Sequence, residues 1–357
     1  MAQNRVYYAC QSVQINGPSG VGLAPTNTQW DTVQGLQSVG LSTNYNLDPV
    51  YQMGQLDLYD NFEEIPEVEV TLNKVLDGQP TLYSMCMGTG ELSALASNVC
   101  GVRLTIHADT DISASGTPLA ACEIMPAYVS SVSYTFPVEG NFTEDITLVA
   151  NSKQWIGDAD LAGLASNGLG MRPIADHPNS GAGIARRALW NDAATVLPVG
   201  ASGGIPADAK VQNVTVSLDL GREAIYNLGD RIPFIRYINF PVEITTEIEV
   251  IATSGDLVGA SELNTACSNP KALVDKEIKI MLCDGTMLDL GNKNKLTNVN
   301  YTGGDTGGGN ATVSYSYITY NKFNYMGPNA ANNYSSMLDG GISFEDTVED
   351  SRTFPLS

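Results

Sequence analysis

The sequence predicts an all-β protein made of two tandem copies of one module, with one short helix in each copy. The first observation is an internal repeat, which indicates that one structural unit occurs twice in the chain. Residues 51–71 (YQMGQLDLYDNFEEIPEVEVT) return as residues 226–250 (YNLGDRIPFIRYINFPVEITTEIEV). The second is the strand-like alternation of apolar and polar residues, and the third is the set of Gly- and Pro-rich turns between such stretches.

The repeat is anchored at two spacings. A tyrosine, a glycine and a proline recur at one constant spacing, whereas a pair of glutamates recurs at a slightly longer one. The matched residues are Tyr51 with Tyr226, Gly54 with Gly229, Pro66 with Pro241, Glu67 with Glu247 and Glu69 with Glu249. The difference between the two spacings predicts a short insertion near the strand start of the second copy.

Composition narrows the function classes. The 357 residues are enough for two domains, and 43% hydrophobic with 16% charged residues indicates folded cores. A net charge of −21 argues against wrapping nucleic acid, which requires clustered Lys and Arg. The chain has six cysteines, none in a C-x-x-C motif, and two histidines, so we expect reduced, buried thiols and no metal site. We expect no secretion leader and no membrane insertion, because no charged-then-apolar opening or long apolar run is present.

The elements follow in the same order in both copies. A strand at 5–15, echoed at 188–199, precedes a Gly/Pro loop, and a half-buried strand at 36–45 is echoed at 211–220. The remaining expected elements are a strand at 65–75, helices at 81–96 and 261–272, strands at 102–109 and 277–284, and hairpins at 127–150 and 296–320.

Each copy has a long loop before its proline, at 47–64 and at 222–239. Loops of this length usually have a function, and both contain aromatic residues of the kind that interfaces use. Two interpretations stay open, a loop folded over its own core and an arm that contacts another subunit. The candidate contact residues are Tyr51, Asp57, Tyr59, Phe62, Tyr226, Arg231, Phe234 and Tyr237.

Two strands carry paired glutamates on one face. Glu67 and Glu69 alternate with valines in the first copy, and Glu247 and Glu249 alternate with Ile and Val in the second. Neighbouring carboxylates on one face repel each other unless they are solvated, so this face should meet water or a basic partner. A catalytic carboxylate pair is the alternative interpretation.

The domain boundaries follow the repeat. We expect a first module at 1–155, a linker at 156–186, a second module at 187–323 and a C-terminal extension at 324–357. No nucleophile motif, dinucleotide fingerprint, phosphate loop or metal-spaced cluster is present, so we expect no enzyme and no cofactor.

The order of elements resembles the major tail tube proteins of tailed bacteriophages, which are related to type VI secretion tubes. The shared order is a strand, then Y-x-x-G with a long loop, then E-x-I-P-x-V-x-V-T at 63–71 and K-V-L-D-G at 74–78, followed by a helix and a closing hairpin. The resemblance implies β-sandwich or barrel modules with a flanking helix. Six such modules form a ring and stacked rings form a tube, so two modules per chain imply a homotrimer with pseudo-sixfold symmetry.

The resemblance also implies roles, partners and a location. The four glutamates would face a channel through which double-stranded DNA is ejected without specific binding, and the loops at 47–64 and 222–239 would stack one ring on the next. Partners would be the chain itself and the tape measure, terminator, baseplate and sheath proteins of a virion tail, assembled in the host cytoplasm. Two alternatives stay open: another virion or fimbrial structural protein, such as a head–tail joining or capsid decoration protein, and a β-sandwich hydrolase that depends on Glu67.

Overall fold

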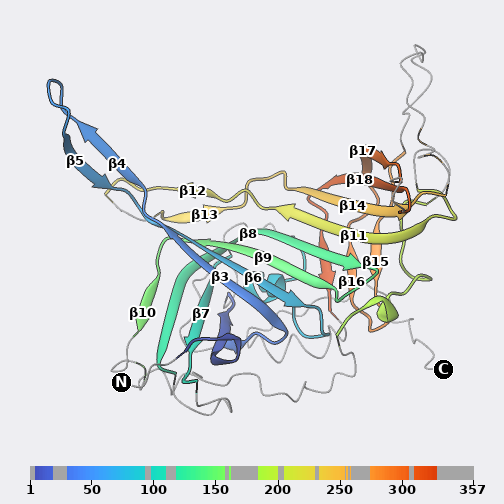
Figure 1. Cartoon of the computed structure of the whole chain (residues 1–357), viewed down its shortest axis with the longest axis horizontal. Helices are drawn as coiled ribbons and strands as arrows, with labels where there is room; N and C mark the ends of the chain where they lie inside the picture. The colour runs from blue at the N-terminus through green and yellow to red at the C-terminus, as the bar shows by residue number, and fades with distance from the viewer. Residues whose placement is uncertain are drawn as a thin grey trace.

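The computed structural model confirms the predicted all-β class, with nineteen strands and one α-helix among the described residues (Figure 1). It describes residues 5–18, 30–92, 98–109, 118–156, 161, 184–199, 205–229, 233–253, 255, 258, 274–304 and 309–327.

The main feature is a continuous run of eight antiparallel strands in the order β17-β18-β14-β11-β8-β9-β6-β3. Two sets of four strands meet in it, a first set (β8, β9, β6, β3) and a second set (β17, β18, β14, β11). The bounds are β3 Leu36–Asn44, β6 Glu67–Val75, β8 Ala120–Pro137, β9 Thr143–Ala150, β11 Lys210–Asp219, β14 Glu243–Ile251, β17 Lys295–Thr302 and β18 Thr312–Tyr320.

The two sets correspond in register as well as in order. Strand β3 has a register shift facing β6 between Leu36 and Ser38, and β11 has the matching shift facing β14 between Val211 and Asn213. The register of β8 relative to β9 shifts between Val129 and Ser131. The register of β17 relative to β18 shifts at the matching place, between Leu296 and Asn298. Irregularities at matching places indicate one backbone used twice, because a bulge is a specific feature of a strand pair.

A second layer covers one face of each set. Over the first set it comprises β1 (Gln11–Asn16), β2 (Asp31–Thr32), β7 (Cys100–Ile106) and β10 (Gln154–Ile156), attached to the first half of β8. Over the second set it comprises β15 (Lys279–Met281), β16 (Met287–Asp289) and β19 (Asn324–Met326). The predicted strand at 5–15 is wrong in its first half, because Tyr8–Cys10 forms a 3-10 turn. At 188–199 the described residues form a second 3-10 turn, Arg187–Leu189, followed by isolated bridges from Trp190, Val196 and Val199 rather than by a strand.

The helix of the first copy is shorter than predicted. Helix α1 spans Leu82–Met87, starts at the side-chain cap of Thr81 and ends at Gly88, whose φ of 69° is left-handed. The expected counterpart at 261–272 lies outside the described residues.

Glu144 of β9 anchors the start of α1. Its Oε2 accepts from Leu82 N (2.7 Å), and its Oε1 accepts from Tyr83 N (2.9 Å) and from the Tyr134 hydroxyl (2.9 Å). Full burial raises the pKa of this carboxyl, and the three hydrogen bonds oppose that shift.

The described cysteines are all free. Cys10, Cys86, Cys100 and Cys122 are buried as expected, whereas Cys283 is exposed. Within the described ranges, no group of three or more side chains is arranged to hold a metal ion. None of the helices in those ranges has the length and apolar character needed to cross a membrane.

Candidate assembly surfaces

The uncovered face of the sheet, here called the polar face, carries the four predicted glutamates. In β6 and β14 the apolar residues are buried while Glu67, Glu69, Glu247 and Glu249 point to the other side. Glu249 is half-buried and the other three are exposed. The Ser314 hydroxyl donates to Glu247 Oε1 at 2.6 Å, and Arg236 Nη2 lies 3.7 Å from Glu67 Oε1. The carboxylates are therefore solvated, with one basic neighbour at the end of the row.

The strand register corrects the alignment of the two glutamate pairs. Val70 pairs with Leu148 and Thr246 pairs with Tyr317, and these two pairs occupy the same place in the two sets. Strands β6 and β14 therefore correspond with Val70 matched to Thr246. Glu67 thus corresponds to Glu243, and the predicted match to Glu247 is four residues out. Because four is even, the slip leaves the predicted side-chain direction unchanged.

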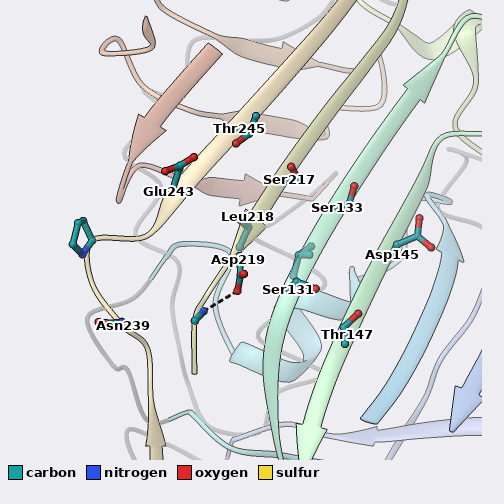
Figure 2. Close-up of a pocket in the computed structure, with 13 residues that line it drawn as sticks. Ser131, Ser133, Asp145, Thr147, Ser217, Leu218, Asp219, Asn239, Glu243 and Thr245 are labelled. Atoms are coloured by element: carbon teal, nitrogen blue, oxygen red, sulfur yellow. Dashed lines mark hydrogen bonds between the residues drawn. The ribbon is translucent and has the colours of Figure 1, made fainter. Parts of the chain in front are cut away.

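Further acidic and hydroxyl side chains lie on the polar face where the two sets meet. Figure 2 shows Asp145 of β9, Asp219 of β11 and Glu243 of β14 around a depression of about 660 Å³. Its described lining contains Ser131, Ser133 and Ser217 but no lysine or arginine. These acids are absent from the predicted glutamate face, although strand alternation alone places them on the same side as the glutamates.

Both predicted long loops form β-hairpins. The first arm consists of β4 (Leu47–Tyr51) and β5 (Leu58–Glu63), and the second consists of β12 (Glu223–Ile225) and β13 (Ile235–Tyr237). They follow β3 and β11 directly, so both leave the sheet at the same end, and Figure 1 shows the first arm projecting from the body.

The first arm is exposed along both of its strands, which contradicts a loop folded over its own core at 47–64. The second arm is exposed at Glu223 and Ile225, but it buries Arg236 of β13. Every residue of β4 and β5 is exposed, as are Asp57 and all six of the predicted aromatics. These aromatics are Tyr51, Tyr59, Phe62, Tyr226, Phe234 and, at the base of the second arm, Tyr237. Arg231 lies outside the described residues. An isolated two-stranded hairpin is marginally stable in water, so apolar arms of this kind are suited to contact another molecule.

The two sets meet in a direct strand pair, here called the junction. Strand β11 pairs with the second half of β8, with Val214 opposite Phe136, Val216 opposite Tyr134 and Leu218 opposite Val132. All six side chains are buried on the covered face. The junction therefore joins the last strand of one set to the first strand of the other through ladder and core.

The outer strands of the run are the counterparts of the two junction strands. Strand β3 corresponds to β11, and β17 corresponds to β8. Within the described part of the chain, no strand pairs with the outer side of β3 or of β17. We call these two sides the free edges, and each exposes backbone groups able to pair with another chain.

Comparison with known proteins gives partial structural similarities. No protein-family model and no curated protein matches the chain. Chains of solved structures do match, among them one from the baseplate of the anti-feeding prophage, 6-fold symmetrised (10% identity, TM-score 0.31, 44% of this chain and 98% of that chain).

Two others come from an extracellular contractile injection system in its extended state. The PVC sheath/tube terminator chain is 14% identical (TM-score 0.32, 44% of this chain, 100% of that chain). The PVC sheath-tube complex chain is 15% identical (TM-score 0.32, 44% of this chain, 95% of that chain). Each similarity spans less than half of this chain at low identity, so we base the function on the geometry of the sheet.

Proposed function

We propose that the chain is a structural subunit of a tail-type tube, in which three chains close edge to edge into a ring and rings stack around an acidic channel. The observation that carries the proposal is the junction. One chain already contains a contact between its two sets of strands, the pair of β8 with β11. The strands at its free edges, β17 and β3, are the counterparts of β8 and β11. Such a head-to-tail contact repeats until the ring closes.

The junction predicts the register of the contact between chains. Ser133 of β8 lies opposite Ser217 of β11. When the matching register shifts of the two sets are superposed, Ser133 corresponds to Asn300 of β17 and Ser217 corresponds to Ser42 of β3. We expect Ser42 of one chain opposite Asn300 of the next. Eight strands from each of three chains give a barrel of 24 strands, and barrels of that size enclose a lumen.

The polar face suits the inside of this barrel. Among the described residues, the second layer covers only the other face of the sheet. In our proposal the face with Glu67, Glu69, Glu247 and Glu249 therefore turns to the channel. Carboxylates repel DNA phosphates over a Debye length of about 8 Å at physiological ionic strength, which keeps passing DNA from binding the wall.

The arms suit contact between rings. They extend beyond the strand ends with exposed Tyr51, Tyr59 and Phe62 on the first arm and Tyr226 and Phe234 on the second. We propose that they pack on the next ring and that terminator, tape measure, baseplate and sheath proteins bind the tube in a virion tail. In this proposal the predicted module bounds of 1–155 and 187–323 are extended to Ile156 and Met326, because β10 and β19 belong to the outer layers of the two sets.

A disulfide experiment tests the ring. In a background with Cys267→Ser and Cys283→Ser, the pair Ser42→Cys with Asn300→Cys should give a covalent trimer on non-reducing gels, because paired strands bring Cα atoms within disulfide range. The matched control Ser133→Cys with Ser217→Cys should close within one chain and run as a monomer.

Two further observations complete the test. Moving one cysteine by two residues, to Asn298→Cys, should lower the yield of trimer because the register is lost. Electron microscopy should show open-ended stacks of rings. Isolated rings or caps at high concentration would favour a head–tail joining or decoration protein, and the absence of any ring would refute the proposal.

A further inference from the structure

We infer that Trp155 is a ring-closing contact residue, which stacks on Tyr301 of the neighbouring copy of this chain. The inference rests on the proposed ring and goes beyond it, because it assigns a side-chain contact in the outer layer rather than the strand pairing at the free edges. It begins from an aromatic contact that one chain already makes across the junction.

That contact joins the second layer of one set to the sheet of the other. Tyr325 of β19 stacks on Tyr134 of β8, with ring centroids 5.8 Å apart and planes at 10°. Tyr134 is 0% exposed and Tyr325 is 4% exposed. The outer layer of the second set thus reaches over the junction and covers the first strand of the first set.

Trp155 occupies the corresponding place in the first set. Tyr325 lies opposite Leu288 in the β16–β19 pair, and Trp155 lies opposite Cys122 in the pair between β8 and β10. Strand β10 starts four residues after β9 ends, as β19 starts four residues after β18 ends. Leu288 and Cys122 are both buried, so Trp155 shares the covered side of its layer and yet is 49% exposed.

Trp155 also lies beside a free edge. Lys153, two residues before it, donates to the Thr43 hydroxyl of β3 at 2.6 Å. Strand β3 is the counterpart of β11. Tyr325 extends across β11 to stack on Tyr134 of β8, the strand that pairs with β11. Trp155 is therefore placed to reach over β3 onto whichever strand pairs with that edge.

The matching acceptor lies at the opposite free edge. Tyr301 of β17 corresponds to Tyr134, because β8 and β17 match when their register shifts, after Val129 and after Leu296, are superposed. Tyr301 is on the side of the sheet that the second layer covers elsewhere, and it is 51% exposed. One chain thus leaves a half-exposed tryptophan and a half-exposed tyrosine at opposite ends of its sheet, and a second copy brings them together.

A double-mutant cycle tests the contact. Trp155→Ala and Tyr301→Ala should each weaken ring formation by about tenfold in dissociation constant, and the double variant should be little weaker than either single variant, because the two changes remove one contact. Tyr320→Ala is the matched control, since Tyr320 is also a strand tyrosine 51% exposed but points to the polar face, and it should leave the constant unchanged.

Two measurements guard against a folding defect and identify the partner. Trp155→Phe should retain ring formation, because an aromatic ring stays in place. A benzophenone amino acid at position 155, in mixed isotope-labelled and unlabelled chains, should cross-link to the peptide around Tyr301 of another chain.

The outcomes separate the two claims. This inference is overturned if the Trp155→Ala variant forms rings as well as the wild-type chain, if the effects in the cycle are additive, or if the cross-link forms only within one chain. Each of these results leaves the ring proposal standing. A wild-type chain that forms no ring under any condition overturns both.

Discussion

Replacing Glu144 by glutamine should destabilise the first set of strands by about 3 kcal/mol, the sum of one unsatisfied buried donor and two weakened hydrogen bonds. The carboxylate accepts three hydrogen bonds in a fully buried site, from the backbone of Leu82 and Tyr83 and from the Tyr134 hydroxyl. A glutamine oxygen placed at Oε1 keeps two of them, but its amide group then faces the Leu82 N–H. A buried donor left without an acceptor costs about 1–3 kcal/mol, and the loss of charge weakens the other two bonds.

The same site allows an internal comparison. Tyr134→Phe removes one hydrogen bond to Glu144 and should cost about 1.5 kcal/mol, because the acceptor is charged. In the Glu144→Gln background the same change should cost less, since the acceptor is then neutral. Tyr317→Phe is the control: the Tyr317 hydroxyl is buried with no hydrogen-bond partner among the described residues, so its removal should be neutral or stabilising.

The free energy of unfolding would be measured by urea denaturation, followed by far-ultraviolet circular dichroism at constant protein concentration. A cost below about 0.5 kcal/mol for Glu144→Gln, or an equal cost of Tyr134→Phe in both backgrounds, would show that this carboxylate does not hold the start of α1.

Two further predictions concern assembly. Met53→Asp with Leu56→Asp, at the fully exposed tip of the first arm, should leave single rings intact and abolish tubes in electron micrographs, because a charge there cannot enter an apolar contact; unchanged tube lengths would exclude the first arm from stacking. Glu69→Lys with Glu247→Lys on the polar face should make assembled tubes retain DNA in a filter assay at low salt and release it as salt rises, whereas the corresponding glutamine variants should bind little. Equal retention by the lysine and glutamine variants would place this face away from the channel.

Local patterns made the strands and their exposed faces predictable. The alternation around Val68 and Val70 assigned Glu67 and Glu69 to the uncovered side, as the structure shows. The sequence predicts both arms only as loops. In the first arm every residue of β4 and β5 is exposed, so no alternation of buried and exposed residues marks a strand.

Contacts between segments that are far apart in the chain could not be predicted from local sequence patterns. Strands β10 and β19 are three residues long, too short to show a period, so the role of Trp155 beside β3 had no local signal. The two glutamate pairs were matched four residues out of register, because repeated E-x-E patterns look alike and only cross-strand pairing fixes the frame. The pairing of β8 with β11 likewise joins segments about 80 residues apart, and no local pattern predicts it.

The free edges are less apolar than the junction to which they correspond. Leu218 of the junction has Thr43 as its counterpart on β3, and Phe136 has Gly303 beyond β17. A bare strand edge invites uncontrolled pairing, and polar or small residues there lower that risk in the unassembled chain.

The internal junction needs no such protection, because covalent linkage keeps its two strands at a high effective concentration. In the proposed ring, joining the two sets of strands in one chain would make half of the contacts strongly apolar and always formed. The other half can be weaker and depend on chain concentration. Ring closure would then respond to supply of the subunit, while each chain keeps a buried core on its own.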